Sequence, residues 1–329
     1  MSARQHEPDD MIRADLQRLL PPAGAPELTP ERHRDLKRNL ITGISARPPA
    51  RRWRIALVTA AAMAVVLLGG AAVAIRPWQS GTETRQSYVA PIIVPVQRAS
   101  VDGVEVLLKR VATAAEEKPP AGDSGFVYVK SRVGFLTFPE NGPAQQEAGV
   151  DPRVMEALHD REIWIPLRSG DGLIRERGLD IVLSDPEPHR RLTELPADPD
   201  VLLEHAYTAT REDTNVPRDR AAFDYIGDAV DESALPPALT GALFRAAAKI
   251  PGVAMVENSV DALGRPGVAV AMTYLDERTE WIFDPATFEY LGQRSYLVAD
   301  TLDGRAGTLT GTSAVVERAV VDKAGNRPR

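Results

Sequence analysis

The pattern of apolar and polar positions divides the chain into a short mixed segment, one uncharged stretch and a long remainder. Residues 55–75 carry no charge, and only Thr59, Gly69 and Gly70 interrupt a run of Ala, Val, Leu, Ile and Met. As a helix these twenty-one residues would be roughly 31 Å long, about the thickness of the hydrocarbon layer of a bilayer. The pattern therefore predicts a transmembrane helix within residues 51–76.

Two other interpretations of the same stretch are open. A cleaved signal peptide would place its apolar region at 55–68, before Ala72-Val73-Ala74, which has the small-x-small form of a cleavage site. More than fifty residues precede that region, however, far more than an ordinary signal peptide carries. A buried helix of a soluble domain is the third interpretation, and an uncharged stretch of this length that is apolar all round argues against it. Because Trp53 and Trp78 bracket the stretch and indoles favour the membrane interface, the span is preferred.

Charge predicts the orientation of this span. The first 54 residues hold eleven basic and seven acidic side chains, whereas the whole chain has a net charge of −7, so the residues after the span carry −11. Six basic residues lie in the twenty positions before Ile55, and two lie in the twenty positions after Ile75. The positive-inside rule then predicts a cytoplasmic N-terminus and an extracytoplasmic C-terminal domain. The acidic balance also argues against a nucleic-acid partner.

The cytoplasmic tail, residues 1–50, reads as two short amphipathic helices. The first ends at Pro21-Pro22, and the second begins after Thr29, with Pro30 at its first helical position. Two helices of this size cannot form a stable core by themselves. Either the tail lies beside anionic lipid, or it docks on a cytoplasmic partner through its apolar stripes. The candidate partner-binding residues are Leu16, Leu19, Leu20, Leu36 and Leu40.

Residues 77–97 read as a linker, and residues 98–329 read as an extracytoplasmic α+β domain. A helix is expected around Val104, Leu108 and Val111, and three more helices are expected to open at Pro199, Pro217 and Pro236-Pro237. Strands are expected at 126–138, 163–167, 173–183, 253–260, 268–275, 279–283, 287–298 and 313–321. Because the connections between the later strands are short, the sheet should be antiparallel, with its helices segregated.

The chemistry-bearing residues do not assemble into a catalytic or metal site. The chain has no cysteine, so thiol nucleophiles, disulfides and cysteine-ligated metals are excluded. Gly122-Asp123-Ser124-Gly125 resembles the nucleophile loop of trypsin-like proteases, but Phe126 follows it, and only His6 and His33 precede Ser124. The histidines of the external domain, His159, His189 and His205, are not at metal-binding spacing.

No enzyme activity and no cofactor are therefore predicted. The remaining candidate for a site is an apolar pocket lined by aromatic side chains, although such side chains are more often plain core. The residues considered for it are Trp164, Trp281 and Phe283.

Three stretches, 15–21, 32–37 and 281–291, together with the apolar span, carry a family resemblance. They resemble a family of actinobacterial single-pass membrane proteins of unassigned activity, often encoded beside an extracytoplasmic-function sigma factor. More distantly, the helix-plus-sheet pattern and the turn at Asp284-Pro285-Ala286-Thr287 are similar to the half-open barrels of lipoprotein carriers and sigma regulators. The resemblance implies an extracytoplasmic sensor or binding domain whose tail regulates a sigma factor. The alternative is a tethered or released half-barrel that binds lipid or peptide and has no regulatory role.

Overall fold

The computed structural model describes residues 88–120, 122, 124–137, 153–184, 192–211, 216–231 and 235–328. The predicted tail helices and the predicted span at 55–75 lie outside these residues. Within the described part of the chain, no helix is both long enough and apolar enough to cross a membrane.

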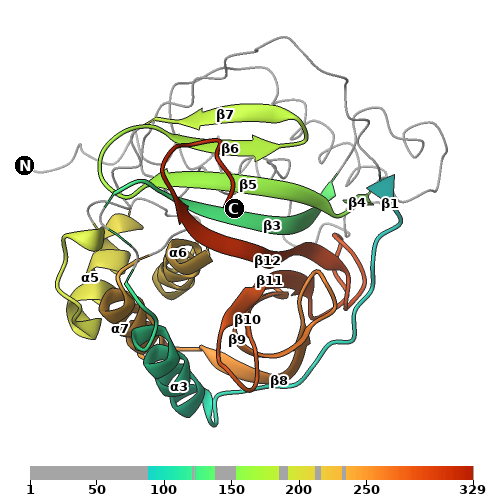
Figure 1. Ribbon diagram of the computed structural model, residues 1–329. Coiled ribbons are helices and arrows are strands. Elements are labelled where there is room, and N and C mark those ends of the chain that lie inside the picture. Colours follow the sequence, from blue (N-terminus) through green and yellow to red (C-terminus); the bar gives the residue numbers. More distant parts are fainter. Residues whose placement is uncertain are drawn as a thin grey trace, which may run out of the picture. The chain divides into compact units, whose positions relative to one another are not determined.

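An antiparallel sheet organises the described residues (Figure 1). Its main path runs β2-β8-β9-β10-β11-β12-β3-β5-β6-β7, and β4 joins it by pairing with β3 and with β1. Every pairing between the described strands is antiparallel, which confirms the predicted α+β class. The strands are β1 (Tyr88–Val89), β2 (Ala99–Ser100), β3 (Phe126–Thr137), β4 (Val154–Glu156), β5 (His159–Pro166), β6 (Gly172–Glu176), β7 (Leu179–Leu183), β8 (Ala254–Val260), β9 (Pro266–Tyr274), β10 (Glu277–Phe283), β11 (Tyr290–Leu297) and β12 (Leu309–Val321).

Three of the described helices begin close to the prolines that predicted them, and α3 lies where its apolar spacing predicted it. They are α3 (Val104–Glu116), α5 (Pro199–Ala209), α6 (Arg218–Asp231) and α7 (Pro237–Ala247). Asp198 caps α5, since its carboxylate accepts hydrogen bonds from the backbone N–H groups of Asp200 at 2.9 Å and Val201 at 3.0 Å. Figure 1 shows all four helices gathered on the same side of the sheet.

The largest core lies between these helices and strands β9 and β10. Successive residues of a strand point to opposite faces, so Trp281 and Phe283 of β10 point together toward the helices. Trp281 is stacked on Phe223 of α6, with ring centroids 3.9 Å apart. On the other face, the buried carboxylate of Glu280 accepts hydrogen bonds from Ser259, Arg294 and Tyr296. Both faces of β10 are therefore buried.

Two sequence expectations need correction. The strand predicted at 173–183 is a hairpin, because Arg177 (φ 53°) and Gly178 (φ 77°) form a tight left-handed turn between β6 and β7. The predicted linker at 77–97 is part of the domain from residue 88 onward. There Tyr88 pairs with Glu156, and the backbone N–H of Val94 donates to the carbonyl of Gly307 at 2.8 Å.

Candidate functional site

A pocket of about 360 Å³ opens between the helices and the sheet. Val111 and Ala115 of α3 and Phe244 of α7 line its helical side, and Phe283 lines its sheet side. Phe283 contacts Phe244 and Tyr290 edge-on, with ring centroids 5.5 and 5.7 Å apart. The remaining lining residues are Lys118, Pro119, Pro120, Val230, Leu235, Pro237, Thr240, Phe288, Glu289, Tyr290, Arg318, Ala319 and Val320. The pocket is thus largely apolar, with a few polar groups.

The polar lining groups come from several elements, and of them only Tyr290 and Arg318 lie on strands. Lys118 forms an ion pair with Glu289 at 2.7 Å. The guanidinium of Arg318 donates through Nη2 to the carbonyls of Val230 at 3.1 Å and Asp231 at 2.6 Å. These bonds tie β12 to the end of α6 and use only one of the guanidinium nitrogens.

Two buried oxygen atoms lie close to Arg318. Among the described residues, neither Oδ1 of Asp231 nor the hydroxyl of Tyr290 has a hydrogen-bond partner of good geometry. Burial raises the pKa of Asp231, although the charge of Arg318 opposes this effect. Burial, and then the charge of Asp231, raise the pKa of Tyr290 well above its ordinary value. Each of the two groups also shifts the pKa of the other through a side-chain hydrogen bond, so Asp231 and Tyr290 face each other beside Arg318.

Charged groups of both signs meet at this end of the pocket. Glu289 is neutralised by Lys118, and burial favours the neutral form of Asp231. Part of the Arg318 residue is exposed to solvent. Its guanidinium is surrounded by protein atoms, and this burial lowers its pKa. A guanidinium stays protonated under ordinary conditions, so Arg318 brings a positive charge to the pocket, where Asp231 and Glu289 act on it.

The structure separates the three aromatic residues that the sequence singled out. Phe283 lines the pocket, and Trp281 lies two residues before it, buried against Phe223. Trp164 belongs to a different cluster, in which it contacts Tyr128 with ring centroids 5.3 Å apart. The tail leucines, Leu16, Leu19, Leu20, Leu36 and Leu40, lie outside the described residues.

Sequence reasoning missed three important residues of the pocket, Phe244, Tyr290 and Arg318. For Arg318 the sequence carries no local signal. Arg318 stands between Glu317 and Ala319 in a strand, where nothing in the local pattern distinguishes it from a solvated arginine. Only the pairing of β12 with β3 and the contact with α6 bring it to the pocket.

The residues considered for catalysis lie apart from the pocket lining. Ser124 is exposed in the bend that leads into β3, and Gly125 has φ 98° and accepts a hydrogen bond from the N–H of Leu167. His159 lies 2.6 Å from Glu176, and His205 lies 2.9 Å from the hydroxyl of Tyr225. Within the described ranges, no group of three or more His, Asp or Glu side chains is arranged to hold a metal ion.

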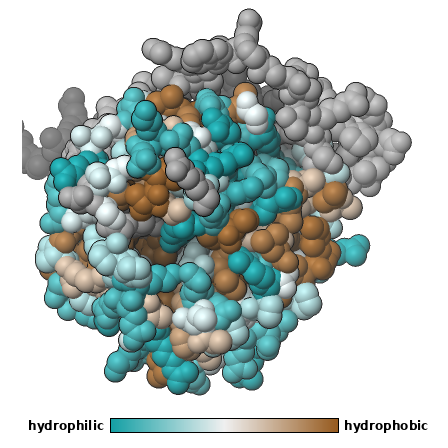
Figure 2. Space-filling view, viewed as in Figure 1, coloured by the Kyte–Doolittle hydropathy of each residue, from teal (hydrophilic) through white to brown (hydrophobic). Residues whose placement is uncertain are grey.

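A second apolar surface lies away from the pocket. Five apolar residues that follow one another closely along the chain have exposed fractions between 37% and 56%. They are Tyr88, Val89, Ile92, Ile93 and Val96. Figure 2 shows hydrophobic residues gathered on the side of this face where Figure 1 places β1. We call these five residues the β1 strip.

No protein-family model and no curated protein matches the chain. Among solved structures, the chain is similar to MucB in complex with MucA(peri), with a TM-score of 0.22 and 14% identity, over 69% of this chain and 57% of that one. It is also similar to the Pseudomonas aeruginosa MucA/MucB complex, with a TM-score of 0.22 and 15% identity, over 69% and 58% of the two chains. The matches thus span less than two thirds of those structures, and at this TM-score they carry no argument. What the geometry defines is an α+β domain with a pocket between its helices and its sheet.

Proposed function

We propose that this domain binds an amphiphile that has an apolar body and an anionic head group. The observation that carries the proposal is the pocket between α3, α7 and strands β10–β12, which is lined mainly by apolar side chains and has Arg318 among its few polar ones. Ligand pockets of about 300–1,000 Å³ with this composition are typical of small-molecule sites. The role is binding without a chemical step.

The apolar part of the ligand would lie among Val111, Phe244 and Phe283. These side chains come from two helices and one strand, so the cavity is supported on both sides by the main core. Removing an alkyl chain from water is favourable by about 0.8 kcal/mol per methylene. An unbranched chain would therefore gain affinity with each methylene that the pocket can cover.

The head group would lie at Arg318. Its guanidinium has donors beyond those bonded to the carbonyls of Val230 and Asp231, and a carboxylate or phosphate accepts such donors well. Glu289 would not repel the head group strongly, because Lys118 pairs with it. Tyr290, which also lines the pocket, would exchange its contact with Asp231 for one with the head group.

We also propose that the domain lies outside the cytoplasm, on a protein anchored by a single span at 55–75. This proposal is supported by the uncharged stretch and by the basic residues before it. A domain in that position could report on amphiphiles of the cell envelope. The tail leucines, with Leu16 as the first, would contact a cytoplasmic partner, for which a sigma factor is the candidate. A tethered carrier with no regulatory role is the second possibility, and the same pocket would serve it.

The binding proposal can be tested with three ligands of equal chain length. Dodecanoate, dodecanol and dodecylammonium are titrated into the full chain held in lipid nanodiscs, and empty nanodiscs measure uptake by lipid. Dodecanoate should bind most tightly. Arg318→Gln should weaken its binding by about tenfold, because a hydrogen bond to a charged group is lost, and should affect dodecanol less.

Two adjacent alanines of α3 provide a matched control for the location of the site. Ala115 lines the pocket, whereas Ala114 is half-buried and does not. Ala115→Phe should abolish binding of all three ligands, and Ala114→Phe should leave it unchanged. If no ligand binds the wild-type chain above the nanodisc background, the proposed function is wrong. If the three ligands bind equally, the head-group assignment is wrong and the apolar pocket stands.

A further inference from the structure

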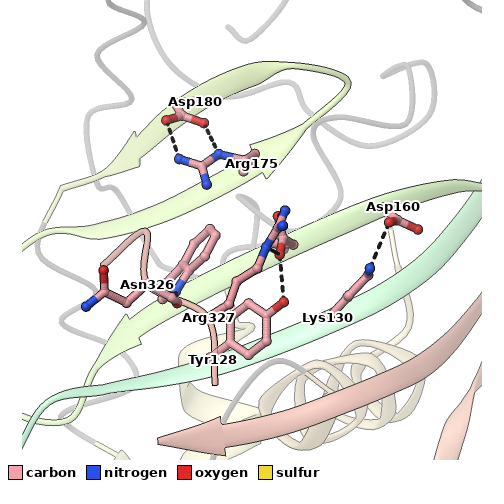
Figure 3. Close-up of polar contacts among 9 residues, drawn as sticks. Tyr128, Lys130, Asp160, Arg175, Asp180, Asn326 and Arg327 are labelled. Atoms are coloured by element: carbon pink, nitrogen blue, oxygen red, sulfur yellow. Dashed lines mark hydrogen bonds and ion pairs between the residues drawn. The ribbon is translucent and has the colours of Figure 1, made fainter. Parts of the chain in front are cut away.

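A segment after β12, residues 322–328, turns back over the sheet (Figure 3). It lies against β3 and β5 on the face opposite the pocket. The strand register shows which face this is. Arg318 of β12 is paired with Val129 of β3, so both side chains point to the same face, and the guanidinium of Arg318 donates a hydrogen bond to α6. The helices therefore lie on the Val129 face. Tyr128 is the neighbour of Val129 in β3 and therefore points to the other face. Trp164 of β5 is paired with Tyr128 and points to that face as well.

The segment is held by two adjacent residues. The indole Nε1 of Trp164 donates to the backbone carbonyl of Asn326 at 2.6 Å. Arg327 then forms a two-pronged ion pair with Glu162, with Nε and Nη2 at 2.6 and 2.7 Å from the two carboxylate oxygens. The hydroxyl of Tyr128 donates to the same carboxylate at 2.6 Å. Figure 3 shows these side chains converging under the segment.

The residues of the domain that hold the segment are buried, whereas the segment itself contributes little apolar contact. Tyr128 and Trp164 are fully buried, and the side chain of Glu162 is 4% exposed. By contrast, the side chain of Arg327 is 62% exposed, and Ala324 is the residue of the segment that packs on the aromatic cluster. The segment is therefore held mainly by the carbonyl of Asn326 and the guanidinium of the next residue, Arg327. Another chain can present the same two groups equally well.

Glu162 makes this site suited to an arginine. The hydrogen bond and charge of Arg327 hold the pKa of Glu162 below its ordinary value. Its cross-strand neighbour Arg175 bears on the same pKa but directs its guanidinium to Asp180, so the two carboxylate oxygens of Glu162 are open to another guanidinium when the segment leaves. The bidentate geometry favours arginine over lysine, because the planar guanidinium matches the two carboxylate oxygens.

We propose that this face is a binding site for an extended arginine-bearing segment of a partner protein, and that residues 322–328 occupy it as an intramolecular competitor. The partner would place a backbone carbonyl on Trp164 and an arginine, one residue later, on Glu162. Free arginine would be a poor ligand because it lacks the preceding peptide carbonyl. The site is separate from the pocket, so this inference does not rest on the proposed function.

The test uses a synthetic peptide with the sequence of residues 322–329. A fluorescent form of the peptide is titrated into the intact chain and into a chain that ends at Val321, and anisotropy is measured. The shortened chain should bind the peptide, and a peptide carrying Arg327→Gln should bind it at least about tenfold more weakly. The intact chain should bind about 100-fold more weakly, because its own segment competes at high effective concentration.

Two results would overturn the proposal. One is that a shortened chain with an unchanged near-ultraviolet circular dichroism spectrum does not bind the peptide. The other is that the Arg327→Gln peptide binds as tightly as the original.

If the shortened chain does not fold, the intact chain with Arg327→Gln replaces it, and Lys323→Gln, an exposed position of the same segment, is the control. Stronger peptide binding by the Arg327→Gln chain than by the control supports the proposal. Equal binding shows that the segment is a fixed part of the fold, and the proposal is then wrong.

Discussion

Replacing Gly227 by alanine should destabilise the domain, although alanine is the better helix former. Gly227 lies inside α6, where the exchange of glycine for alanine normally stabilises a helix by about 1 kcal/mol. Here the new methyl group would lie 2.7 Å from Cε2 and 3.0 Å from Cζ2 of Trp281, and closer still to Nε1. These separations are well inside van der Waals contact, so one of the two elements must move.

The indole has little room to move. Trp281 is 1% exposed, and its ring is stacked on Phe223 at an interplanar angle of 7°. Overpacking of a well-filled core typically costs about 1–3 kcal/mol. Subtracting the gain in helix propensity of about 1 kcal/mol leaves an expected net loss of about 0–2 kcal/mol in the free energy of unfolding.

Gly241→Ala in α7 is the matched control. Its methyl group would meet the side chain of Glu116, with Cγ at 2.6 Å, and this exposed side chain can swing away. The loss of its ion pair with Arg245 should cost about 0–1 kcal/mol, which the gain in helix propensity of about 1 kcal/mol offsets. Urea denaturation followed by circular dichroism measures both variants. If Gly227→Ala is as stable as Gly241→Ala, the packing argument is refuted.

Further predictions concern the α5 cap, Glu162 and the predicted membrane topology. Asp198→Ala should lower the free energy of unfolding by about 1 kcal/mol in urea denaturation, and Asp198→Ser should cost less, because serine can still cap α5. Since Arg327 lowers the pKa of Glu162, the ionised carboxylate stabilises the fold above its ordinary pKa of 4.5, and this contribution is lost as the pH falls. A Glu162→Gln chain should therefore show a flatter loss of stability below that pH, and an unchanged acid limb would contradict this. A reporter active only outside the cytoplasm should work when it is fused after residue 100 and fail at residue 45; the opposite pattern would reverse the orientation. Leu16→Asp should reduce capture of a cytoplasmic sigma factor by residues 1–50. Equal capture would show that this leucine does not contact the sigma factor.

The elements that the sequence predicted well are those with local causes. The start of α5 needs only Asp198 and Pro199, which are adjacent in the chain and act on the first helical turn. The antiparallel class likewise followed from the short connections between later strands. The hairpin at β6 and β7 was missed because Arg177 is an unusual residue for a left-handed turn, and Gly178 alone did not outweigh the apolar run around it.

The pocket was largely beyond sequence reasoning because its parts are far apart in the chain. Phe283 was among the aromatic candidates, but Phe244 and Arg318 belong to α7 and β12. Their meeting depends on strand order and on how α6 packs, neither of which leaves a local pattern. Trp164 shows the converse problem, since an aromatic residue in a strand can face either side of a sheet.

The most direct test of the central claim locates a bound amphiphile on the chain. A dodecanoate analogue with a diazirine near the end of its alkyl chain is irradiated with the full chain in nanodiscs, and the adducts are mapped by mass spectrometry. Binding in the pocket should give adducts at Val111, Ala115, Phe244 or Phe283, which dodecanoate competes away and which are lost in Ala115→Phe but not in Ala114→Phe. Adducts confined to the β1 strip, or labelling that Ala115→Phe leaves unchanged, would contradict it.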